Sequence, residues 1–226
     1  MNAPIRILVH GASGRMGRAL LRLAAADARF EVLSTPPSSA ASLDDCPEFD
    51  VAIDFSVAPG FDRILRLCRS RLSALVSGTT GLSDAQRLAL ANAGKDIPIV
   101  WASNFSLGVV VLEDLVRRAA RALPGWHGEI TETHHIHKKD APSGTALVLA
   151  SAHEAGSGSA PGITSIREGE VVGDHRIRLE GNGEWLELRH HAMDRDIFAR
   201  GALEAAARLH GRFAGLYSLS DLVLSD

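Results

Sequence analysis

The segment from Glu129 to Ala146 holds the densest group of side chains that could carry acid–base chemistry. Three histidines between positions 134 and 137 are followed directly by Lys138 and Lys139. Histidine exchanges protons near neutral pH, and lysine supplies both a proton donor and a positive charge. These residue types at this spacing predict a site for proton transfer.

The run Pro142-Ser143-Gly144-Thr145 follows at once and opens a predicted helix. The first backbone N–H groups of a helix have no intrahelical partners, and the helix dipole favours negative charge there. A proton donor beside such a helix start predicts chemistry on a small substrate that carries carboxylates.

A glycine-rich loop near the start of the chain indicates a second binding function. The run Gly11-Ala12-Ser13-Gly14-Arg15-Met16-Gly17 joins a predicted strand to a predicted helix. Glycines let the backbone turn tightly and approach phosphates, and the helix N-terminus attracts their charge. Ser13 stands where the commoner fingerprint has glycine, and an ordinary turn is the alternative. The strand before the loop and the helix after it favour a dinucleotide site, and hence a nicotinamide-dependent reductase.

Two further loops are expected at the nicotinamide end of that dinucleotide. Residues 77–81 follow the fourth predicted strand, and residues 102–105 follow the fifth. Parallel sheets bind ligands at the carboxyl ends of their strands. An ordinary turn is again the alternative for each loop.

The segment after the second predicted strand lacks the residues that usually choose the cofactor. A carboxylate there normally binds the ribose hydroxyls of NAD, and an arginine accommodates the 2′-phosphate of NADP. Residues 35–38 read Thr-Pro-Pro-Ser and supply neither group. Arg15 or Arg18 could reach a phosphate from the glycine loop, or could be a solvated helix side chain. The sequence therefore predicts that NADH and NADPH are both used.

Hydrophobic periodicity places these motifs on alternating strands and helices. The first half predicts strands at 5–9, 30–33, 51–55, 74–76 and 97–101, helices at 15–26, 58–70 and 83–93 with Ser83 as N-cap, and a loop at 35–46. This alternation is typical of a parallel sheet covered on both faces. The second half predicts an α+β unit, with a helix at 109–123, strands at 129–137, 163–172, 175–180 and 185–191, a helix at 145–154, a surface loop at 156–162 and a final helix at 198–210.

Composition excludes several classes of protein. The 226 residues carry a formal net charge of -3, which gives no electrostatic reason to bind nucleic acid. No apolar run reaches the roughly 18–20 residues that a membrane span needs. The N-terminus lacks the features of a signal peptide. Cys46 and Cys68 have no metal or redox spacing, so we expect a cytoplasmic protein.

The histidines also raise the question of a metal. Three histidines in four residues could be ligands, with His190 or His191 completing a zinc hydrolase site. Neighbouring strand residues point to opposite faces, however, so His134 and His135 cannot readily share one ion. We therefore expect no metal. The other alternative to a proton-transfer site is a solvated basic turn.

The same segment is similar to a known signature. The pattern E-I-x-E-x-H-x-x-x-K-x-D-x-P-S-G-T-A is met at every fixed position from Glu129 to Ala146. It resembles the signature of the 4-hydroxy-tetrahydrodipicolinate reductase family, formerly called dihydrodipicolinate reductase. The resemblance extends to residues 11–17, 78–80, 104–106, 172–175 and 195–202, and so covers most of the chain.

The resemblance implies a fold and an assembly. The fold would be a Rossmann-like parallel-sheet cofactor domain at 1–105, completed by 196–226, and an α+β mixed-sheet domain at 106–195. The second domain would bind the substrate and build a homotetramer, and the boundary between the domains would act as a hinge.

Residue roles follow from positions in the signature. His134 would be the catalytic acid/base and Lys138 the proton donor. The substrate, a small dicarboxylate, would be held by His135, Lys138, Ser143, Gly144 and Thr145. The cofactor would be held by Gly11, Ala12, Ser13, Gly14, Arg15, Met16, Gly78, Thr79, Thr80, Ala102, Ser103, Asn104 and Phe105.

The implied reaction is hydride transfer from NADH or NADPH to a cyclic imino dicarboxylate, with loss of water, in the pathway to diaminopimelate and lysine. Two alternatives remain: another small imino- or amino-acid dehydrogenase on the same scaffold, and a catalytically silent dinucleotide-binding regulator. His134 and Lys138 argue against the silent regulator, which needs neither. The chain is shorter than the family expectation at 36–46 and at 156–162.

Overall fold

The computed structural model describes residues 3–33 and 46–225, which fall into two compact units. The first unit comprises residues 1–105 and 196–226, and the second comprises residues 106–195. The predicted loop at 35–46 and the cofactor-choosing positions 35–38 lie outside the described residues, apart from Cys46. In the described part of the chain, no helix is long and apolar enough to cross a membrane.

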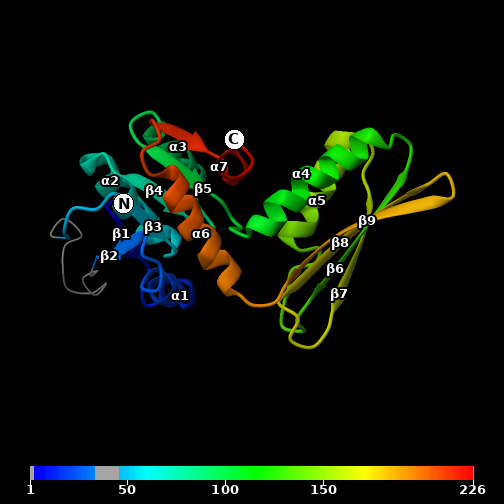
Figure 1. Cartoon of the computed structure of the whole chain (residues 1–226), viewed down its shortest axis with the longest axis horizontal. Coiled ribbons are helices and arrows are strands. Elements are labelled where there is room, and N and C mark those ends of the chain that lie inside the picture. The colour runs from blue at the N-terminus through cyan, green and yellow to red at the C-terminus, as the bar shows by residue number, and fades with distance from the viewer. Residues whose placement is uncertain (1–2, 34–45, 226) are drawn as a thin grey trace. The chain divides into compact units, whose positions relative to one another are not determined.

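The first unit is built on a six-stranded sheet in the order β10-β5-β4-β3-β1-β2, in which every neighbouring pair is parallel (Figure 1). The strands are β1 (Ile5–His10), β2 (Phe30–Val32), β3 (Val51–Asp54), β4 (Ala74–Ser77), β5 (Pro98–Trp101) and β10 (Gly215–Tyr217). The central strands are short runs of apolar residues and are buried, as expected for parallel strands covered on both faces. The predicted parallel, doubly covered sheet is confirmed.

Helices cover both faces of this sheet. They are α1 (Arg15–Ala24), α2 (Ala58–Arg71), α3 (Asp84–Ala93), α6 (Asp196–Leu209) and α7 (Leu219–Val223). On one face, Phe61 of α2 and Leu90 of α3 share a core with Leu8, Leu75 and Ile99 of the strands. Helix α6 packs against α1 and against β3, β4 and β5 on the other face. The predicted N-cap Ser83 is confirmed, because its hydroxyl accepts from the Gln86 N–H.

The second unit is a four-stranded mixed sheet with two helices on one face. The sheet has the order β7-β6-β8-β9, where β6 pairs parallel with β7 and antiparallel with β8, and β8 pairs antiparallel with β9. Its elements are β6 (His127–His134), β7 (Gly162–Arg167), β8 (Gly173–Gly181), β9 (Glu184–Ala192), α4 (Leu107–Ala122) and α5 (Gly144–Ser157). The expected mixed sheet is confirmed.

The core of the second unit lies between the helices and the sheet. Val116 of α4 and Leu149 of α5 pack with Ile130 of β6 and Ile177 of β8. Figure 1 shows α4 and α5 side by side over the strands. The polar functional residues described below occupy the end of this same inner sheet face, beside the start of α5.

Several predicted boundaries were wrong. The strand predicted at 129–137 ends at His134, because the next residues turn and the Lys138 N–H bonds the His135 carbonyl at 3.1 Å. The strand predicted at 163–172 ends at Arg167, and Gly169 follows in the left-handed region. The predicted loop at 156–162 shrinks, since α5 runs to Ser157 and β7 starts at Gly162. Strand β10 and helix α7 were not predicted at all.

The glycine loop is packed tightly against the first helix. Gly11 has a φ of 85°, a region that favours glycine, and Gly17 is buried on α1 directly behind the loop. A side chain at Gly17 would overlap the Gly11 carbonyl oxygen and the backbone of Ala12. The conformation of the loop therefore depends on the absence of a side chain at Gly17.

We expect Gly17→Val to displace this loop. Overpacking of this kind costs roughly 1–3 kcal/mol of unfolding free energy. The free energy of dinucleotide binding should weaken by more than the free energy of unfolding. Ala25→Val, which places a valine at the exposed C-cap of α1, is the control. Denaturant titration and cofactor fluorescence titration measure the two effects. An unchanged cofactor affinity in folded Gly17→Val would contradict the assignment of the loop.

Candidate active site

Three loops of the first unit leave the same edge of the parallel sheet. They follow the carboxyl ends of β1, β4 and β5, and they hold all the predicted cofactor residues except Arg15 and Met16, which open α1. Since neighbouring parallel strands end at one edge, the topology brings these three predicted segments together. The glycine loop follows β1, residues 78–80 follow β4, and residues 102–105 follow β5.

The glycine loop fits a phosphate-bearing cofactor. Gly14 is the N-cap of α1 and places no side chain over the helix start, and the first turn of α1 contains no acidic residue. Ser13, Gly14 and Arg15 are exposed, while Ala12 and Met16 are half-buried. Backbone and helix dipole together therefore present partial positive charge to an anion. Arg18 also stays on the loop, since its guanidinium donates to the Ser13 carbonyl.

A buried carboxylate ties the ends of three strands together behind these loops. Asp54 ends β3 and is 0% exposed. Its oxygens lie 2.9 Å from His10 Nδ1, 2.9 Å from Ser77 Oγ and 2.8 Å from Thr79 Oγ1. Burial raises the pKa of Asp54, but hydrogen bonds from His10, Ser56 and Thr79 outweigh it and hold the pKa below its usual value. The ionised group thus fixes the β4 loop against the end of β1.

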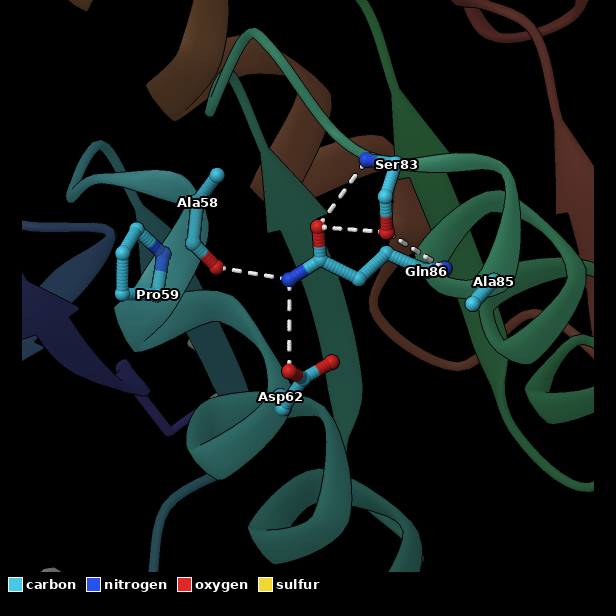
Figure 2. A pocket seen from close by; sticks show the side chains of 6 residues that line it. All are labelled: Ala58, Pro59, Asp62, Ser83, Ala85 and Gln86. Atoms are coloured by element: carbon cyan, nitrogen blue, oxygen red, sulfur yellow. Dashed lines mark hydrogen bonds between the residues drawn. The ribbon is translucent and has the colours of Figure 1, made fainter.

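A pocket on the same unit shows how the far end of the β4 loop is held. Figure 2 shows Gln86 at its centre, and the lining residues are Ala58, Pro59, Asp62, Ser83, Ala85 and Gln86. The Gln86 side-chain amide donates to the Ala58 carbonyl at 2.7 Å and to Asp62 at 3.2 Å. Its Oε1 accepts from the Ser83 N–H at 3.0 Å. This pocket contains none of the predicted site residues, and its hydrogen bonds anchor α3 to α2.

Some predicted cofactor residues could act only through their backbone. The Thr79 hydroxyl is bonded to Asp54. Phe105 is 1% exposed, with its ring edge-on to Phe55 at 5.5 Å. Gly78 and Ala102 are half-buried, as is Asn104, while Thr80 and Ser103 are exposed.

In the second unit, the register of the strands assembles a polar row across the inner face of the sheet. Glu132 of β6 pairs with Ser165 of β7 on one side and with His175 of β8 on the other, and His175 pairs in turn with His190 of β9. In the next row, His134 pairs with Arg167. Residues paired across strands point to the same face, so this row gathers two histidines and a carboxylate in one place.

Glu132 is the centre of this group. It is 0% exposed, and its carboxylate contacts His134 Nδ1. It accepts from Arg167 Nη2 at 3.0 Å and from the Ser143 N–H at 3.4 Å. Burial raises its pKa, but hydrogen bonds from Ser165, Arg167 and His134 outweigh this and keep the pKa below its usual value. The carboxylate is therefore charged and acts only as an acceptor.

The surroundings of His134 shift its pKa in opposite directions. Burial lowers its pKa, Glu132 raises it, and the charges of Lys138 and Arg167 lower it again, with a net lowering. Its ring meets that of His175 edge-on, with centroids 5.0 Å apart. Burial lowers the pKa of His175 to about 4, helped by the neighbouring histidines, so His175 is neutral near pH 7. His134 therefore has a pKa below its usual value, mainly because of burial, and lies beside a ring that is neutral near pH 7.

Lys138 lies in the turn that follows β6. Its ammonium donates to both carboxylate oxygens of Asp140, at 2.9 and 2.8 Å, and its side chain is 23% exposed. This ion pair holds the pKa of Asp140 below its usual value. The ammonium is close enough to His134 to lower the pKa of the ring. The structure thus brings together the two predicted acid–base residues.

The predicted substrate residues around the start of α5 have different surroundings. Ser143 is buried as the N-cap: its hydroxyl accepts from the Ala146 N–H and lies 3.4 Å from His175 Nε2. Gly144 is exposed and Thr145 half-buried at the first turn, which contains no acidic residue. His135 is half-buried after the strand end, with its N–H on the Val171 carbonyl at 2.7 Å. Gly144 and Thr145 are therefore the helix-start residues best able to meet a carboxylate.

The group Glu132, His134 and His175 could also be considered as a metal site. Each offers one ligand atom, and these atoms lie within 4.8 Å of one another. The histidine that could share a metal ion with His134 is thus His175 and not the adjacent His135. However, Glu132 already binds the guanidinium of Arg167, whose fixed charge opposes a cation beside it. The geometry favours a hydrogen-bond network over a metal site.

Sequence reasoning missed several members of the network. Glu132 lies two residues before His134 on a strand, and this spacing places both side chains on one face, so the signal was present. Arg167 and His175 come from other strands, and His190 was considered only as a metal ligand. Their places depend on a parallel β6–β7 pair and two antiparallel pairs, which no local pattern specifies.

Comparison with known proteins agrees with this arrangement. Residues 5–105 match the family described as "Dihydrodipicolinate reductase, N-terminus", and residues 108–223 match "Dihydrodipicolinate reductase, C-terminus". A protein of Xanthomonas axonopodis pv. citri (strain 306), named 4-hydroxy-tetrahydrodipicolinate reductase, is 54% identical, covering 97% of this chain and 98% of the relative. One of the same name from Xylella fastidiosa (strain 9a5c) is 51% identical, covering 99% and 100%.

Solved structures share the fold. A dipicolinate-bound dihydrodipicolinate reductase from Paenisporosarcina sp. TG-14 superposes with a TM-score of 0.79 at 22% identity, covering 95% of this chain and 97% of that one. The DAP dehydrogenase of C. glutamicum follows with a TM-score of 0.60 at 11% identity, covering 99% and 96%. The match to both family halves and the 54% identity over nearly the full length lead to one conclusion: this chain belongs to the dihydrodipicolinate reductase family.

Proposed function

We propose that the chain is the oxidoreductase that converts 4-hydroxy-tetrahydrodipicolinate into tetrahydrodipicolinate and water in the pathway to diaminopimelate and lysine. The family and the shared name of its relatives at 54% identity support the reaction. The observation in this chain that carries the proposal is the pairing of a buried Glu132–His134 couple with Lys138, next to the start of α5. A bound NADH or NADPH would supply the hydride.

The chain's own residues must donate a proton and bind the substrate carboxylates. When hydride reaches the conjugated imine formed by water loss, the substrate gains negative charge, and a proton must neutralise it. Lys138 is the donor in this proposal, and His134 tunes or relays the proton. His135, Gly144 and Thr145 face the substrate carboxylates, with Ser143 setting the geometry of the helix start.

The predicted cofactor residues keep their roles as part of the proposal. The glycine loop, from Gly11 to Met16, would bind the pyrophosphate through backbone N–H groups. Residues 78–80 and 102–105 would border the nicotinamide end. Support comes from the uncapped start of α1 and from the shared sheet edge.

A homotetramer in the cytoplasm completes the proposal. The outer face of the mixed sheet, opposite α4 and α5, exposes Ile166 at 40% on one edge strand and Trp185 at 57% on the other, and in the proposal this face meets another copy of the chain. The two cysteines, both free and buried, suit a reducing compartment. Light scattering that gives four times the chain mass would support the assembly, and a stable monomer would oppose it.

The direct test of the reaction couples the purified chain to the synthase that makes its substrate and follows the loss of NADH or NADPH absorbance. Turnover that depends on the coupled substrate is expected. Turnover with other small imino or amino acids instead would favour the alternative of a different dehydrogenase. Cofactor binding without any turnover would favour a silent regulator.

Lys138→Ala should lower kcat by roughly 10²–10⁴-fold, the usual loss for a positioned proton donor. Lys139→Ala is the matched control, because it removes the neighbouring exposed lysine. Steady-state rates of both folded variants are compared with the parent chain. A loss below about fivefold for Lys138→Ala would remove this residue from the proton-donor role.

Cofactor choice should be weak, because residues 35–38 supply neither a carboxylate nor an arginine. We expect kcat/KM for NADH and NADPH to agree within about tenfold, or about 1.4 kcal/mol. Arg15 could tilt the ratio towards NADPH, and salt should weaken this tilt. The measurement is kcat/KM for both cofactors at low and high ionic strength, with and without Arg15→Ala. A preference above about a hundredfold would mean that a charged residue from elsewhere lines the ribose site.

A further inference from the structure

Glu132 connects the two proposed acid–base residues although it adjoins only one of them. Its carboxylate meets His134 Nδ1 directly. On its other oxygen it accepts from Arg167, whose Nε donates to the Lys138 carbonyl at 3.3 Å and whose Nη2 also donates to the Asp140 carbonyl. Arg167 therefore bridges the buried carboxylate to the backbone of Lys138 and of Asp140.

The contact with His134 fixes which ring nitrogen is chemically active. An ionised carboxylate can only accept, so it holds a proton on Nδ1 whether the ring is charged or neutral. Protons are then gained and lost at Nε2. That nitrogen is on the side of Gly173, where an added Cβ would lie 3.3 Å from it. A glycine at this position leaves Nε2 uncrowded.

We propose that Glu132 is a positioning residue of the reaction, which fixes the ring of His134 through Nδ1 and, through Arg167, fixes the turn that carries Lys138. The inference rests on the function proposed above, because it assigns Glu132 a role through the two residues given there. It adds to that function a carboxylate and a guanidinium that act through His134 and Lys138.

The charges around His134 define the expected pH behaviour. Glu132 raises the pKa of His134, whereas burial, Lys138 and Arg167 lower it, and His175 beside it is neutral near pH 7. Glu132→Gln removes the only one of these influences that raises the pKa. The pKa of His134 should therefore fall, and the protonated ring should be lost at a lower pH.

Two readouts test the proposal in Glu132→Gln. In ¹⁵N-histidine NMR, the neutral His134 ring of the parent chain should carry its proton on Nδ1. The variant should mix the two tautomers and lower the pKa of His134 by about one unit. In steady-state assays, kcat should fall by roughly 10–100-fold, with KM within about threefold. The His134→Gln spectrum assigns the resonance among the ten histidines of the chain.

Two further variants separate positioning from a purely structural role. Asp174→Asn is the control: this buried carboxylate also binds an arginine and a histidine, Arg189 at 2.8 Å and His191 at 2.7 Å, but does not contact His134. It should leave the pKa of His134 unchanged and kcat within about twofold. On a His134→Ala background, Glu132→Gln should lower kcat by a smaller factor than on the parent background, because only its effect through Arg167 on the segment of Lys138 remains.

Arg167→Lys keeps the positive charge near Glu132 and loses the fork that holds the turn, so kcat should fall while the tautomer of His134 stays the same. This variant also keeps the test open if Glu132→Gln does not fold. An unchanged tautomer and pKa of His134 in folded Glu132→Gln, with kcat within about threefold, would overturn the proposal. If the parent chain does not turn over the substrate, the proposed reaction fails, while the NMR result still decides the role of Glu132.

Discussion

A charged carboxylate with no exposure to solvent is costly unless every lone pair finds a donor, and Glu132 is such a group. Its donors come from three segments: His134 at the end of β6, Arg167 and Ser165 on β7, and Ser143 at the start of α5. Because these contacts offset the cost of burial only together, one carboxylate fixes the relative positions of two strands, a turn and a helix start. The geometry of the proposed proton-transfer site is thus set by an electrostatic requirement of the fold.

The first unit solves a similar problem with Asp54. Its carboxylate is also buried at the carboxyl end of a strand, and its donors come from the ends of β1 and β4 and from the Ser56 N–H. In both units a negative charge inside the sheet end orders loops whose own sequences are rich in glycine or polar residues. Such loops gain little from hydrophobic burial, so a polar anchor beneath them replaces it.

The sequence was most informative where structure is local. The glycine loop was predicted because a strand, three glycines and a helix follow one another within about twenty residues, and Ser83 was recognised as a cap from its own neighbours. Glu132 could have been placed beside His134 from its spacing alone. Arg167, His175 and His190 could not, since they reach the site only through the order and register of β6, β7, β8 and β9. Strand β10 was not predicted because its three residues, one of them glycine, are too few to show a hydrophobic periodicity.

The chain returns to the first unit after completing the second, and this has a consequence for the order of folding. Strand β10, which extends the sheet beside β5, and helix α6, whose Ala199, Ala202, Ala206 and Leu209 are buried, come from the segment after residue 195. During synthesis, the first 105 residues therefore emerge without the helix that covers one face of their sheet. That face stays open until the inserted second unit has been made. The first unit cannot complete its core before α6 and β10 leave the ribosome, whereas residues 106–195 are contiguous and can fold first.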